Sequence, residues 1–135
     1  MKYVLDTTAF SAFMRRDEAL LELLAGFAPR DIVTVPPVIA EIQYGIQRLD
    51  RTSKKYLLLQ TERDRILSVV AVLPWVAGSS EKYGEIKAAL ERRGQLIDDF
   101  DIAIAAIALS HRCGVLTANL KHFQRIERLE SRSWS

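Results

Sequence analysis

Four acidic residues lie where the surrounding hydrophobic pattern predicts a protein core: Asp6, Glu41, Asp99 and Asp101. A carboxylate at the edge of a core costs several kcal/mol unless a positive group lies beside it. We expect no buried Arg or Lys partner beside any of the four. A divalent cation would neutralise them together, and hard oxygen ligands favour Mg²⁺ or Mn²⁺. The four acids therefore predict a divalent metal site.

Asp6 is followed by Thr7 and Thr8, directly after an apolar segment that predicts the first strand. An Asp at this place commonly caps the next helix by accepting a hydrogen bond from its first turn. Phosphatases with two aspartates one residue apart also begin in this way, but Thr8 stands where the second aspartate would be. A helix cap and a metal ligand both stay open for Asp6.

Glu41 lies on a predicted helix between Val38 and Tyr44, which places it beside an apolar stripe. The alternative is an exposed Glu at the boundary of that stripe. Gly45, one turn later, costs about 1 kcal/mol of helix stability relative to Ala. Close approach of another element would explain that cost.

Three acids, Asp98, Asp99 and Asp101, precede the apolar helix that begins at Ile102. Capping and the helix dipole explain one or two acids at a helix N-terminus, and three less well. Ala105 and Ala106 allow this helix to approach the sheet closely, which would draw Asp101 inward.

The last candidate segment is 117–123, with Thr117, Asn119 and His122. Asn119 is typical of a turn. For His122, a general base, a phosphate contact and a half-buried polar residue without a chemical role all stay open.

Strands and helices are predicted to alternate along the whole chain. Expected strands are 2–5, 32–35, 70–73 and 115–117, with a further short strand or tail at the end of the chain. Expected helices are 7–16, 18–27, 36–49, 54–69, 79–92, 99–111 and a short helical turn at 122–128, and the helix at 54–69 is expected to pack through Leu58, Ile66 and Val69. Alternation predicts a parallel sheet covered by helices on both faces. Asp6 and Asn119 follow strands, and ligands bind beyond the carboxyl ends of such strands.

Composition predicts one soluble domain over residues 1–135, with 49% hydrophobic and 27% charged residues. The formal charge of +2 permits a nucleic-acid partner without indicating one. The single cysteine, Cys113, excludes a disulfide framework and a thiolate zinc site. Asp6 interrupts the first apolar run, so no signal peptide is expected, and the longest apolar run, 102–109, is too short for a bilayer. A cytoplasmic location without membrane association is expected.

In order and spacing, these residues resemble the PIN-domain family and, within it, the VapC-type ribonuclease toxins of toxin–antitoxin pairs. The resemblance extends from Tyr3 to about Leu129 and is carried by Val4-Leu5-Asp6-Thr7, Glu41 with Gly45, Asp99-Phe100-Asp101 with Ile104-Ala105-Ala106, and Leu116-Thr117 with Asn119 and His122-Phe123. Two positions depart from it. Thr8 stands where the family often has Asn or Ser, and His122 where it often has a fourth acid. Asp99 is expected to supply the missing charge.

The resemblance implies a three-layer α/β/α domain, with a central parallel sheet of four to five strands, that cleaves RNA through a water activated by Mg²⁺ or Mn²⁺. Asp6 and Asp101 would be the main metal ligands, completed by Glu41 and Asp99 directly or through water. The side chains expected to orient ligands or waters are Thr7, Thr117 and Asn119. A cognate antitoxin that inserts a segment into the acidic pocket, and a homodimer, are implied as partners.

Substrate contacts are expected from basic side chains outside the acidic cluster. The candidate RNA contacts are Arg15, Arg16, Lys121, His122 and Arg125, with Arg92, Arg93, Arg128 and Arg132 as further cations around the approach. Two other functions stay open. One is an inactive PIN-like binding or assembly module. The other is a phosphatase that uses Asp6, which needs a second acid and a Lys beside it.

Overall fold

Short apolar segments form the centre of the molecule as a parallel sheet. The computed structural model describes residues 1–135. The strands are β1 (Tyr3–Leu5), β2 (Ile32–Thr34), β3 (Ala71–Val72), β4 (Gly114–Leu116) and β5 (Ser131–Arg132). They pair in the order β3-β2-β1-β4-β5, and every pair is parallel. Every residue of the three central strands is buried, as expected for a sheet covered on both faces.

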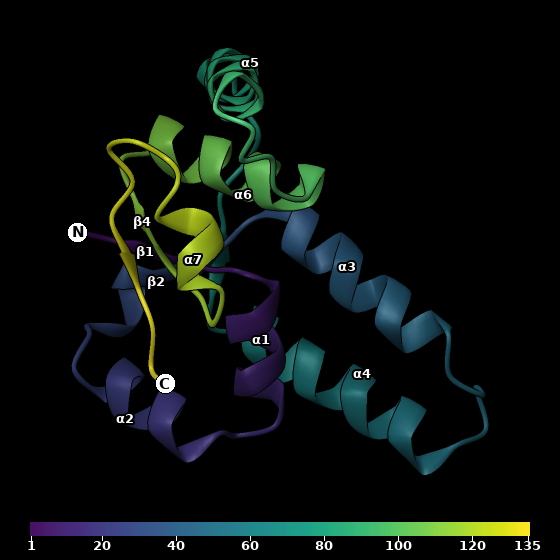
Figure 1. Ribbon diagram of the computed structural model, residues 1–135. Helices are drawn as coiled ribbons and strands as arrows, with labels where there is room; N and C mark the ends of the chain where they lie inside the picture. Colours follow the sequence, from purple (N-terminus) through teal and green to yellow (C-terminus); the bar gives the residue numbers. More distant parts are fainter.

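Helices cover both faces of this sheet. They are α1 (Thr7–Met14), α2 (Glu18–Ala25), α3 (Pro36–Gln47), α4 (Lys54–Leu67), α5 (Ala77–Arg92), α6 (Asp99–Ser110) and α7 (Leu120–Phe123), with a short 3₁₀ helix at Pro29–Asp31. In Figure 1, α5 and α6 lie above the strands, α1 and α2 lie below them, and α3 and α4 extend to one side as a pair. This arrangement confirms the expected α/β/α fold with a parallel sheet. No helix combines the length and apolar character needed to span a bilayer.

The helix α6 is apolar on nearly all sides, which explains its central place in the upper layer. Ile102, Ile104 and the whole segment 105–108 are buried. A helix without a polar face is stable only when neighbours cover it all round. The strand β4 and the helices α3 and α5 provide that cover. The N-terminus of α6, with its acids, is thereby held at the edge of the sheet.

The strand order places the ends of β1 and β4 side by side. From β1 the chain adds β2 and β3 on one side, then returns to add β4 and β5 on the other. The order of strands reverses between β1 and β4, and such a switch point opens a crevice at the carboxyl ends of the strands. The backbone N–H of Asp6 donates to the carbonyl of Leu116 at 3.1 Å, which joins the two strand ends.

Three local predictions are wrong. Of the three expected anchors only Ile66 is buried; Leu58 and Val69 are 57% and 68% exposed, and Tyr56 and Glu62 are buried beside Ile66 instead. The α4 orientation is held by Glu62, which pairs with Arg16 at 3.0 Å and with Arg65 at 2.5 Å. A Cβ added at Gly45 would meet no atom within 4 Å, so no element of this chain approaches it. The last helix spans Leu120–Phe123 rather than 122–128, since the chain continues in turns beyond the buried Phe123.

Candidate metal centre

Asp6 lies at the end of β1, is 1% exposed, and uses only one of its two carboxylate oxygens within the protein. Its Oδ1 caps α1, accepting from the Ala9 N–H at 2.8 Å and the Thr8 hydroxyl at 2.6 Å. Its Oδ2 is buried without a hydrogen-bond partner. Buried polar atoms are almost always paired, so Oδ2 is open to a partner from outside the chain. The Thr117 hydroxyl is the one further protein group that lowers the pKa of this carboxyl from beyond α1.

Burial raises the pKa of the Asp6 carboxyl, although the hydroxyls of Thr117 and Thr8 and the nearby backbone N–H groups oppose that effect. The raised pKa means that the ionised form is poorly solvated where it lies. A cation beside Oδ2 would favour the ionised form.

Thr8 is a member of this site that the sequence alone did not identify as functional. Its hydroxyl donates to Asp6 and accepts from the backbone N–H of Ala118 at 2.9 Å. It therefore ties the start of α1 to the loop after β4. The only signal in the sequence was a small polar residue at a position where the family often has Asn or Ser.

Glu41 reaches the same site from α3. Its Oε1 accepts a hydrogen bond from the Thr7 hydroxyl at 2.5 Å. Val38, Ile42 and Ile46 of the same helix are buried, which confirms the apolar stripe beside Glu41. Packing of that stripe fixes the helix, and Thr7 then holds the carboxylate of Glu41 near the first turn of α1.

Asp101, in the first turn of α6, is surrounded by the other acids. Its pKa is raised to about 6, first by burial and then by the negative charges of Asp6, Asp98 and Glu41. Carboxylates this close destabilise one another when all are ionised. The expected gathering of Asp6, Glu41 and Asp101 is what the structure shows.

Asp99 lies apart from this group. Its carboxylate pairs with Lys87 Nζ of α5 at 3.0 Å, and its side chain is 62% exposed. The expectation that none of the four acids has a basic partner is therefore wrong for Asp99. Asp98 is exposed as well, but its charge acts on Asp101, and it lines a hollow together with Glu41. Asp98 also caps α6, accepting from the Phe100 N–H at 2.7 Å.

The segment after β4 closes the site. Thr117 is buried, and its hydroxyl accepts from the N–H of Asn119 at 2.8 Å, whereas Asn119 itself is exposed. On α7, His122 Nδ1 lies 3.6 Å from Asp101 Oδ2 and is buried without a hydrogen-bond partner. His122 therefore places an imidazole nitrogen beside Asp101, at the position where the family often has a further carboxylate.

A PIN-domain family model matches residues 3–129. The chain belongs to the PIN-domain family.

Its relatives within that family are VapC ribonucleases. Ribonuclease VapC2 of Rickettsia felis is 29% identical over 99% of this chain and 98% of its own length, and Ribonuclease VapC2 of Haemophilus influenzae is 28% identical over the same shares. The crystal structure of VapBC2 from Rickettsia felis, bound to a DNA fragment from its promoter, contains a chain that matches with a TM-score of 0.85 and 31% identity, covering 100% of both chains. VapBC-1 from nontypeable Haemophilus influenzae matches with a TM-score of 0.85 and 28% identity over 99% of this chain and 98% of that chain.

The acids of this PIN domain fit a divalent cation of the Mg²⁺ type. No three of the His, Cys, Asp and Glu side chains stand close enough together to enclose an ion as they are. Mg²⁺ does not need such a cage, because it keeps several waters and is usually held by one or two carboxylates. The free Oδ2 of Asp6 and the mutually repelling charges around Asp101 are the two features that fit.

The candidate RNA contacts fall into two groups. Arg16 is paired with the buried Glu62, and Arg15 donates to Ser11 of its own helix. Lys121 and His122 lie on α7, and His122 lies beside Asp101. Arg125 follows one turn later.

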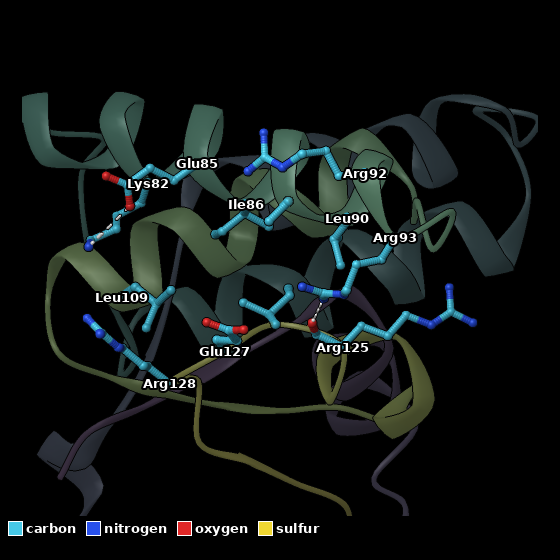
Figure 2. Close-up of a pocket in the computed structure, with 12 residues that line it drawn as sticks. Lys82, Glu85, Ile86, Leu90, Arg92, Arg93, Leu109, Arg125, Glu127 and Arg128 are labelled. Carbon is cyan, nitrogen blue, oxygen red and sulfur yellow. Dashed lines mark hydrogen bonds and ion pairs between the residues drawn. The ribbon is translucent and has the colours of Figure 1, made fainter.

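A larger cavity, of about 360 Å³, lies beyond Arg125 between α5, the end of α6 and residues 125–128. Figure 2 shows its basic side chains around an apolar interior; these are Lys82, Arg92, Arg93, Arg125 and Arg128. Two acids, Glu85 and Glu127, also line it, and none of the clustered acids does. Arg125 donates to the carbonyls of Gln95 and Leu96, which come shortly before Asp98 in the chain. This contact connects the lining of the cavity to the segment that carries Asp98.

Proposed function

We propose that this chain is a metal-dependent endoribonuclease that acts as the toxin of a toxin–antitoxin pair. One observation carries the proposal: the buried carboxylate of Asp6 keeps an oxygen free beside Asp101 and Glu41. Membership of the PIN-domain family supports it, as do relatives named as VapC ribonucleases and structural neighbours described as VapBC complexes. A cognate antitoxin and a second copy of the chain are the partners that this function implies.

Each side chain of the site has a part in this proposal. A bound Mg²⁺ or Mn²⁺ would supply an activated water and would offset the negative charge of the approaching phosphate. Asp6 and Asp101 would hold the ion directly. Thr8 fixes the carboxylate of Asp6, and Thr7 fixes that of Glu41. Thr117 and Asn119 would orient waters from the loop after β4.

Substrate contacts are proposed on the side of α7. Lys121, His122 and Arg125 would contact phosphates of the RNA next to the acidic cluster. The basic cavity, which Arg125 lines, would contact phosphates further along the same RNA strand. Arg15 would contribute from the end of α1. Arg16 is the weakest of the candidates, because its guanidinium already neutralises the buried Glu62.

Mapping of RNA ends after a pulse of expression tests the function. We expect new 5′ ends at a small set of sites with the wild-type chain and none with Asp6→Ala at matched protein level. The carboxylate is removed at the point where an unpartnered oxygen faces the site, so RNA cleavage should fail while the fold stays. Equal numbers of new ends in both strains would reject the endoribonuclease.

A second prediction separates Asp98, Asp99 and His122. Asn keeps the capping ability of an Asp while removing its charge. Asp98→Asn is expected to weaken Mn²⁺ binding several-fold, whereas Asp99→Asn should leave it unchanged, because Asp99 faces Lys87. His122→Ala should change it only modestly, since a neutral imidazole adds a dipole rather than a charge.

Isothermal titration of the three variants with Mn²⁺ measures these effects. The Asp98 and Asp99 variants are matched controls for each other, because both sit at the same helix end. Weaker binding by Asp99→Asn with unchanged binding by Asp98→Asn would restore Asp99 as the acid of the site.

A further inference from the structure

A small hollow of about 230 Å³ lies directly beside the acidic cluster. It is lined by Ala40, Glu41, Tyr44, Asp98 and Phe100. Two of these five residues are aromatic, and both are open to solvent: Tyr44 is 66% exposed and Phe100 is 43% exposed. Exposed apolar side chains that lie together, unlike ones scattered singly over a surface, are a feature of binding sites.

Each ring is fixed relative to one acid of the site. Tyr44 follows Glu41 by three residues on α3, so the two side chains lie on the same face of the helix. Phe100 directly precedes Asp101 in the first turn of α6. Both rings are thus carried by the same rigid helices that carry the carboxylates, and a ligand at the cluster passes beside them.

The fold gives neither ring a packing role. Both lie outside the hydrophobic core, and the aromatic pairs in contact are Tyr3 with Phe27 and Trp75 with Tyr83. The Tyr44 ring has a cationic neighbour, Arg48, whose guanidinium lies 5.6 Å from the centre of the ring. A guanidinium over a ring steadies it by a cation–π contact. The ring of Tyr44 is therefore held in place while it stays exposed.

We propose that this hollow binds one unpaired nucleobase of the RNA substrate, stacked on Tyr44 and Phe100 beside the phosphate that is cut. The inference rests on the proposed endoribonuclease and adds where the substrate is held. The carboxylates of Glu41 and Asp98 repel phosphate, so the hollow suits the flat, uncharged part of a nucleotide. Carboxylate oxygens also accept from the amino groups of adenine, cytosine and guanine. The base must be unpaired, because bases within an RNA duplex do not offer their faces to side chains.

Binding of RNA with and without bases tests the inference. The probes are fluorescein-labelled decaadenylate and a decamer of abasic ribose units with the same number of phosphates, in Ca²⁺ to limit cleavage. We expect wild type to bind decaadenylate about ten-fold more tightly than the abasic decamer, the size of effect that one stacked base provides. Tyr44→Leu and Phe100→Leu should each reduce that preference, and the double variant should abolish it.

Conservative variants and a distant aromatic serve as controls. Tyr44→Phe and Phe100→Tyr keep a ring and should keep the preference, which distinguishes stacking from general apolar contact. Trp75→Leu removes an exposed aromatic side chain outside the hollow and should change nothing. With an RNA that the wild type cuts, the Leu variants should raise KM and keep kcat.

Two outcomes would overturn the inference. In one, the double Leu variant keeps the wild-type preference for decaadenylate. In the other, RNA binding is unchanged while self-association of the chain or antitoxin binding is lost, which would make the hollow a protein contact. Both are separable from failure of the endoribonuclease itself, since the binding comparison needs no cleavage.

Discussion

Replacing Asp101 by Asn is expected to abolish RNA cleavage and, in EDTA, to make the folded protein more stable at neutral pH. Cleavage should fall by more than about 100-fold, because substitutions that only support a metal ligand already cost 10- to 100-fold. Asp101 is the acid on which the charges of Asp6, Asp98 and Glu41 converge. The measurement is RNA cleavage at matched concentrations, with circular dichroism to show that the variant is folded.

The stability effect has a definite pH window. The pKa of Asp101 is raised from 3.8 to about 6 in the folded protein. The folded protein therefore binds more protons than the unfolded chain between these values, and its free energy of unfolding falls as the pH rises through that window. Above it, the ionised carboxylate is fully destabilising, and Asn removes that penalty.

Urea unfolding in EDTA measures this effect. Asp101→Asn should gain about 1–3 kcal/mol near pH 7.5 and almost nothing near pH 4, since one pKa unit corresponds to 1.36 kcal/mol. Asp64→Asn is a suitable control, because the Asp64 side chain is 69% exposed. A loss of stability at pH 7.5 would show instead that the fold, through His122 for example, holds the Asp101 carboxylate favourably.

Removal of divalent metal should stop cleavage altogether. EDTA is expected to abolish activity, Mg²⁺ or Mn²⁺ to restore it, and Ca²⁺ to restore it poorly, because Ca²⁺ needs more ligands and longer bonds than these few carboxylates offer. An ion that binds only the folded protein also raises its melting temperature. Mn²⁺ should therefore raise the melting temperature of the wild type, and do so much less in Asp6→Ala.

Thermal melts and cleavage assays over a metal series check this prediction. The Asp6→Ala variant controls for non-specific effects of the ion, since it lacks the free Oδ2; it also lacks the Oδ1 that caps α1, so its melting temperature is compared with and without Mn²⁺ rather than with that of the wild type. Cleavage that continues unchanged in excess EDTA would refute a metal-dependent reaction.

Several features followed from the sequence because they depend on local rules. Alternation of apolar strands with amphipathic helices predicted the parallel sheet, and the carboxyl ends of parallel strands share one edge, which brought Asp6 close to the segment at Asn119. The capping role of Asp6 was also local, since an Asp directly before a helix accepts from its first turn. The apolar stripe of α3 is likewise a local feature, because it follows from the helical period, and it placed Glu41 toward the carboxyl edge of the sheet.

Other features were decided only by packing. Asp98 is the N-cap of α6 and Asp99 is its first helical residue, so the helical period does not say which of the two lies toward the other acids. The sequence favoured Asp99 as the acid of the site, but α5 places Lys87 beside Asp99, and it is Asp98 that lines the hollow with Glu41. In α4, the long-range pair of Glu62 with Arg16 decided which side is buried, and Leu58 was left outside. The bridge from Thr8 to Ala118 spans 110 residues, and only the tertiary structure brings such distant groups together.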